Sequence, residues 1–109
     1  MKKEAKVRRR KKLFQNLLEK MSKWKVEGYI EKAAMYAAAK ICGNRIEEAR
    51  IATKAAWALG DVLDFYPHKK PPIDLGWRLV KEACKNPEKT LKEINIKEIP
   101  MEIRKYFGI

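Results

Sequence analysis

A chain of 109 residues is long enough for one domain with its own core, without metal or disulfide support. Its 46% hydrophobic and 37% charged residues exclude a disordered chain, and no apolar run approaches the roughly 18 residues of a membrane span. The net charge of +12 is uneven, because residues 1–25 hold 11 Lys or Arg and two Glu, which leaves +3 for residues 26–109.

The first predicted helix covers about residues 4–22. Its apolar residues recur with the i, i+3, i+4, i+7 spacing of a helix face, and they are Phe14, Leu17, Leu18 and Met21. This face fades before Leu13, where charged residues take over. We therefore assign residues 1–12 to a basic N-terminal arm and residues 13–109 to a single helical domain.

Two longer helices follow, from about Trp24 to Cys42 and from Asn44 to about Phe65. Alanines make up much of both apolar stripes, which would allow close helix packing. The first stripe is Val26, Ile30, Ala33, Ala34, Ala37 and Ile41, and the second is Ile46, Ala49, Ala52, Ala56, Leu59 and Leu63. Asn44 and Glu47 predict a capping box, and Trp57 is expected to close one edge of the core.

A fourth helix is predicted from a cap at Asp74 to about Lys85, with Trp77, Val80, Ala83 and Cys84 as its apolar set. A short helix starts at Asn86, and another lies between Pro100 and Gly108. A short extended segment through residues 94–99 is an alternative for the connection between them. The predicted fold is all-α: a small helical bundle of four main helices plus one or two short C-terminal helices, with the basic arm in front.

The arm contains five consecutive cations, residues 8–12. Since successive helix residues turn by about 100°, these cations surround the axis, whereas a membrane-surface helix needs a cationic face opposite an apolar one. A polyanion fits this distribution better, because each Lys or Arg on a phosphate releases counterions. The sequence therefore predicts that the protein binds nucleic acid with little sequence specificity, and DNA in preference to RNA. The residues predicted to bind are Arg8, Arg9, Arg10, Lys11, Lys12, Lys20, Lys23, Lys25, Lys69 and Lys70.

Other interpretations of these residues stay open. Trp24 could stack on an unpaired base, but a core position at a helix junction is favoured. The loop 66–72 is either a stiff backbone clamp or an ordinary solvated loop. The arm could also be a solvated tail or a contact to an acidic protein. Residues 38–52 resemble a helix-turn-helix only loosely, because Glu47 and Glu48 would face phosphates at the start of the second helix.

The alternative function is a protein–protein assembly subunit, either a homodimer or a helical adaptor in a larger complex. It would use the Ala-rich helix faces and nearby aromatic side chains. A single exposed patch formed by Trp24, Trp57, Trp77, Tyr29 and Tyr36 would favour this alternative over a basic surface.

Neither an enzyme nor a cofactor is predicted. His68 has no obvious partner, and the sequence contains no glycine-rich phosphate loop, nucleophile elbow or metal-spaced cluster. Asp61 and Asp64 share one helix face and could hold Mg²⁺, but we favour an exposed acidic edge near Lys54, or a partner for Lys69 and Lys70.

Cys42 and Cys84 are expected to be buried thiols in a reducing cytoplasm, with a disulfide as the alternative in a hyperthermophile. The composition is typical of such a source, archaeal or from an archaeal virus. It has one Gln, one Ser and two Thr beside abundant Lys, Glu and Ile. No apolar stretch follows the cationic N-terminus, so no secretory signal is expected.

Overall fold

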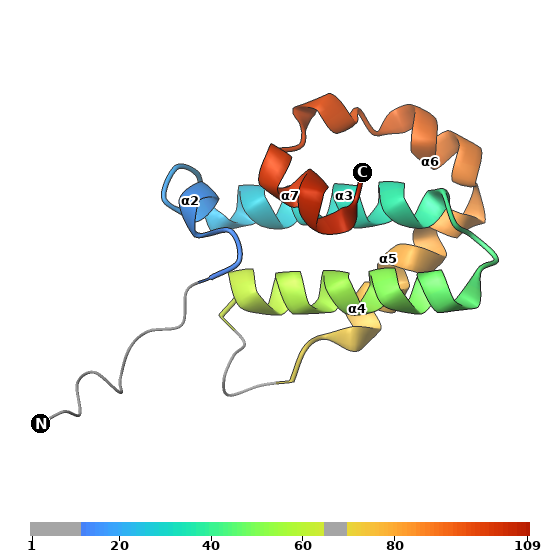
Figure 1. The fold of residues 1–109 in the computed structure, drawn as a ribbon, viewed down its shortest axis with the longest axis horizontal. Helices are drawn as coiled ribbons and strands as arrows, with labels where there is room; N and C mark the ends of the chain where they lie inside the picture. Colours follow the sequence, from blue (N-terminus) through green and yellow to red (C-terminus); the bar gives the residue numbers. More distant parts are fainter. Residues whose placement is uncertain (1–11, 65–69) are drawn as a thin grey trace, which may run out of the picture.

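The computed structural model describes residues 12–64 and 70–109 (Figure 1). Their helices are α2 (Gln15–Leu18), α3 (Lys23–Ala39), α4 (Arg45–Val62), α5 (Ile73–Lys85), α6 (Pro87–Glu93) and α7 (Met101–Phe107), with a 3₁₀ turn η1 (Ile96–Glu98). These residues contain no strand, which confirms the predicted all-α bundle. None of the described helices has the length and apolar character needed to span a membrane.

The helices α3 and α4 lie side by side and antiparallel, and α5 packs against both (Figure 1). The last part of the chain returns over α3, which α6 and α7 both contact. The alanine stripes form the centre of the bundle, where Ala33, Ala34, Ala38, Ala52, Ala55, Ala56 and Ala58 are fully buried. Small side chains let the helix backbones approach, and Gly76 on α5 lies so close that an added Cβ would be 2.1 Å from the Ala52 carbonyl oxygen.

The first helix is shorter than predicted. Within residues 12–22 the helical part is only α2, which buries Leu17, while Phe14 is buried just before it. Residues 4–11 of the predicted helix lie outside the described residues. The chain turns after α2 and restarts at Ser22, whose hydroxyl accepts a hydrogen bond from the Lys25 amide at 3.2 Å.

The predicted core stripe of α4 was wrong at two positions. Ile46 is 76% exposed, and Trp57 is 47% exposed instead of closing the core edge. The helix is packed between α3 and α5, so it buries a wide sector that includes Ile51, Ala55 and Leu59. At about 100° per residue, Ile46 and Trp57 fall on the side opposite this sector.

Local capping signals were mostly correct. The Asn44 side chain accepts a hydrogen bond from the Glu47 amide at 3.2 Å, as the predicted capping box requires. The second bond of the box is made by Glu48 in place of Glu47, because Glu48 Oε2 accepts from the Gly43 amide at 2.8 Å. At the start of α6, Asn86 caps as predicted, and α7 ends at Gly108 in the left-handed region. The helix α5 starts one residue before the predicted cap Asp74, which lies in its first turn. Within the segment predicted as possibly extended, Ile96–Glu98 form the turn η1, while Ile94, Asn95 and Ile99 beside it have extended backbone conformations.

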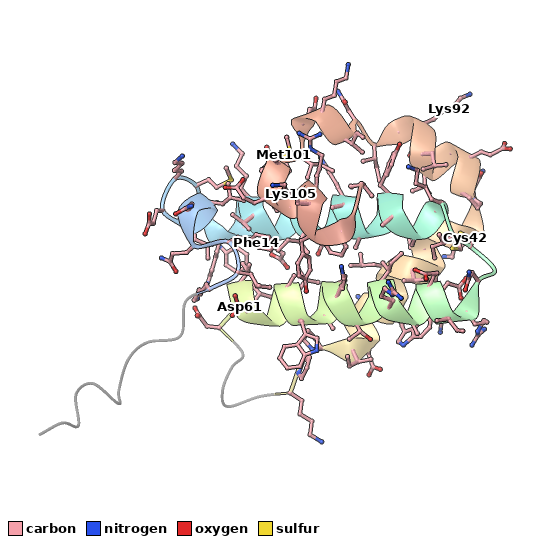
Figure 2. The ribbon with its side chains drawn as sticks, in the orientation of Figure 1. Phe14, Cys42, Asp61, Lys92, Met101 and Lys105 are labelled. Atoms are coloured by element: carbon pink, nitrogen blue, oxygen red, sulfur yellow. A yellow bond between two sulfur atoms is a disulfide. The ribbon has the colours of Figure 1, made fainter. Side chains whose placement is uncertain are left out.

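The expected free thiols are joined. Cys42 follows α3, Cys84 lies near the end of α5, and they form a disulfide with Cα atoms 5.7 Å apart (Figure 2). The two ends meet because α3 and α5 pack together along the bundle. The disulfide therefore links two segments that are 42 residues apart in the sequence.

A second link joins α4 to α7. The Lys54 ammonium donates to the Tyr106 carbonyl oxygen at 2.7 Å, and the Tyr106 hydroxyl donates to the Lys54 carbonyl oxygen at 3.1 Å. The Phe14 ring meets the Tyr106 ring edge to face, with centroids 5.7 Å apart. The C-terminal helix is thereby fastened to α4 and to the start of the described chain.

Candidate nucleic-acid interface

The structure describes five of the ten residues predicted to hold nucleic acid. Lys20, Lys23, Lys25 and Lys70 are exposed, and Lys12 is partly buried. The other five lie outside the described residues, and they are Arg8, Arg9, Arg10, Lys11 and Lys69.

Three of the exposed lysines gather where α2 passes into α3. Lys23 and Lys25 lie in the first turn of α3, which contains no acidic residue, and Lys20 precedes it. The N-terminus of a helix carries about half a positive charge and normally attracts carboxylates. Each of these helix lysines therefore costs about 0.3–1 kcal/mol at low ionic strength, a cost that a bound anion would relieve. We name Lys20, Lys23, Trp24 and Lys25 the corner cluster.

Trp24 is the aromatic member of the corner cluster. It is 65% exposed, so the favoured prediction of a core position was wrong. The reason is helix geometry: Val26 is fully buried, and a residue two positions earlier points about 200° away from it. The Lys23 ammonium lies 5.3 Å from the Trp24 ring centroid. One face of the indole thus has a cation above it, and the side chain is open to a planar ligand.

Lys12 has a structural partner. Its ammonium donates to Asp64 Oδ1, and the next residue, Leu13, donates its amide to Asp61 Oδ2 at 2.7 Å. Asp61 is only 3% exposed, so the predicted exposed acidic edge was wrong for this residue (Figure 2). Among the described residues, the cation on Asp64 is Lys12 and neither Lys54 nor Lys70.

The pKa of Asp64 is affected by both Lys12 and Lys23, which lie close to its carboxyl group. The hydrogen bond from Lys12, and then the charges of Lys12 and Lys23, lower its pKa below the ordinary value of an aspartate. The end of α4, the start of the described chain and the first turn of α3 therefore meet at one end of the bundle. Lys12, the residue that follows the run of cations in the sequence, therefore lies at the same end of the bundle as the corner cluster.

No contact among the described residues places Lys70 near the corner cluster. Lys70 lies shortly before α5, and Gly76 in the first half of α5 already packs against Ala52, in the middle of α4. The predicted closing role of Lys70 thus has no geometric support from the described part of the chain.

The described residues also contain no group of three His, Cys, Asp or Glu that could hold a metal ion. Glu27 and Glu31 lie one turn apart on α3. Burial and then the charge of Glu27 raise the pKa of Glu31, and no third carboxylate completes a site there.

Comparison with known proteins finds no matching family model, no similar curated protein and no similar solved structure.

Proposed function

We propose that this protein binds nucleic acid, DNA in preference to RNA, through the phosphate backbone and with little sequence specificity. The observation that carries the proposal is the corner cluster: an exposed tryptophan among three lysines at an acid-free helix N-terminus. The cations of residues 8–11 come directly before Lys12 in the sequence, and Lys12 lies at the same end of the bundle as the corner cluster. Backbone contacts by Lys and Arg and stacking by an aromatic ring are the two features common to non-specific binders of single strands.

The arrangement of α3 and α4 supports the low sequence specificity. The two helices are side by side (Figure 1), whereas a helix-turn-helix crosses its helices at a steep angle and presents the second one to the major groove. Glu47 and Glu48 also lie in the first turn of α4. An accessory or packaging role fits this kind of binding. The composition favours a thermophilic archaeon or an archaeal virus as the source, and the disulfide is compatible with a cytoplasmic protein of such a source.

The alternative of an assembly subunit has less support. The Ala-rich faces on which it relied are covered inside the chain, since the alanines of α3 and α4 pack against one another and α5. Trp77, Tyr29 and Tyr36 are half-buried, and only Trp24 and Trp57 of the five aromatics are exposed. Two exposed aromatics are fewer than the single patch of several aromatics that this alternative requires, so we do not adopt the assembly function.

The arm is tested in the full chain by replacing Arg8, Arg9, Arg10 and Lys11 with Gln. We expect the affinity for fluorescent DNA at low salt to fall by at least about tenfold, since four phosphate contacts are lost. The matched control replaces four exposed lysines that form no ion pair with a described residue, Lys32, Lys92, Lys97 and Lys105. It removes the same charge from other surfaces. Affinity is measured by fluorescence anisotropy. An equal loss of DNA affinity in both variants would show that only the net charge matters and would contradict DNA binding by the arm.

The stacking role is tested by Trp24→Leu and Trp24→Phe. Stacking of a base on an aromatic side chain is worth about 1–3 kcal/mol, so Trp24→Leu should weaken single-stranded DNA binding by at least about fivefold. Trp24→Phe keeps a π face and should recover most of the affinity. Both substitutions are at an exposed site, so the melting temperature should stay nearly constant. Equal binding by the Leu variant and the unmodified protein would exclude stacking on Trp24.

A further inference from the structure

A second basic surface lies on α5, more than 60 residues after the arm in the sequence. Two adjoining hollows share Trp77 and Lys81. One is also lined by Arg45 from the first turn of α4 and by Cys84, and the other by Arg78. We name the pair the α5 hollow. From the sequence we expected Trp77 in the core, and Arg45, Arg78 and Lys81 had no predicted role.

The charges of the α5 hollow leave three cations unpaired. Glu82 pairs with Lys85 at 3.2 Å, and the Glu48 carboxylate accepts from the Gly43 amide at 2.8 Å. Arg45, Arg78 and Lys81 form no salt bridge with any residue of 12–64 or 70–109. A hydrogen bond from an amide does not cancel the charge of Glu48, so Glu48 and Asp74 remain as carboxylates without a salt bridge in the lining. Arg45, Arg78 and Lys81 outnumber these two carboxylates, which leaves one net positive charge to attract an anion into the hollow.

The indole of Trp77 gives the hollow a flat apolar wall. The side chain is half-buried and packs against the core, so the ring is held in place, yet it lines both parts of the hollow. The disulfide also fixes this part of the hollow. Cys84 is one of its lining residues, and Cys42 lies three residues before Arg45. An aromatic wall beside unpaired cations matches a ligand that carries both a flat ring and a phosphate.

We propose that the α5 hollow binds a nucleotide unit, with its base against Trp77 and its phosphate between Arg45 and Lys81. A guanidinium can hold a phosphate through two parallel hydrogen bonds, and the ammonium adds a point charge. The nucleotide comes either from a strand held by the corner cluster or from solution. In the first case the inference rests on the proposed function, and in the second case it is independent of it.

The ligand class is tested by NMR titration of the full chain at low salt with three probes: deoxyadenosine monophosphate, deoxyadenosine and inorganic phosphate. We expect the monophosphate to shift the Trp77 indole N–H and the amides of Arg45 and Lys81. It should bind at least about fivefold more tightly than phosphate, the factor that stacking contributes. Equal binding of phosphate and monophosphate would overturn the nucleotide assignment, and so would shifts confined to other residues.

The source of the nucleotide is tested with Arg45→Gln/Lys81→Gln and a charge-matched control, Lys92→Gln/Lys97→Gln. Loss of monophosphate binding in the first variant only is expected. If a strand supplies the nucleotide, the same variant should also weaken single-stranded DNA binding and reduce the salt slope by about one to two. If DNA binding is unchanged while monophosphate binding is lost, the hollow takes free nucleotides. If no DNA binds the unmodified protein, the proposed function is wrong. The monophosphate titration then still shows whether the α5 hollow binds a nucleotide. Equal monophosphate affinity in both variants would overturn the inference.

Discussion

Gly76→Ala is expected to destabilise the fold by about 3 kcal/mol or more, at the upper end of overpacking effects. The added Cβ would lie 2.1 Å from the Ala52 carbonyl oxygen and 2.9 Å from its carbon, and both atoms belong to the backbone of α4. A flexible side chain could move aside, but a helix backbone in a packed core must shift as a whole. The helices α4 and α5 would have to separate, and the buried alanines between them would lose contact.

The matched control is Gly28→Ala, in the middle of α3. A Cβ at this position would meet nothing within 4 Å, so the substitution should stabilise by about 0.5–1 kcal/mol through helix propensity. Thermal unfolding should separate the two variants clearly, since 1 kcal/mol corresponds to about 4–8 °C in a domain of this size. A Gly76→Ala protein that melts within a few degrees of the unmodified chain would contradict the close packing of α4 on α5.

Removing the disulfide is the second large effect that we expect. The cross-link spans 42 residues of sequence, and the loop-entropy relation gives a loss of about 4 kcal/mol on opening it. Denaturant unfolding should therefore show a much lower midpoint for Cys42→Ala/Cys84→Ala, with a similar slope.

A reducing agent supplies the control for this prediction. It should lower the midpoint of the unmodified protein towards that of the double variant and leave the double variant unchanged. Alkylation followed by mass measurement reports whether the thiols are free before reduction. An unmodified protein that alkylates fully without reduction, or that unfolds at the same midpoint with and without reductant, would contradict the Cys42–Cys84 bond.

The helix boundaries were largely predictable because their signals are local. Asn44 and Asn86 cap through their own side chains, and Gly108 takes the left-handed conformation that ends α7. The buried side of α4 was harder to predict, because it depends on two partner helices and not on one. For the same reason nothing in the sequence near Gly76 shows that Ala52, 24 positions earlier, lies against it.

Lys20, Lys23 and Lys25, which we expected from the sequence to contact phosphate, are exposed, since lysines in a turn and a first helical turn have no core to enter. Their contact with phosphate stays a prediction. Lys12 was placed among the free cations, but its partner Asp64 is 52 residues away and no local pattern indicates the pair. The unpaired cations around Trp77 come from α4 and α5 and become a group only through the packing of these helices.

The salt dependence of DNA affinity shows whether the protein holds nucleic acid by its phosphate backbone. The full chain is titrated into fluorescent single-stranded and double-stranded DNA and the matching RNA at several salt concentrations. About six phosphate contacts on a single strand predict a slope of roughly −4 in a plot of log affinity against log salt. For binding through the phosphate backbone we expect a slope at least this steep, with DNA bound more tightly than RNA. No binding at low salt, or an affinity that barely changes with salt, would show that the protein does not bind nucleic acid in this way.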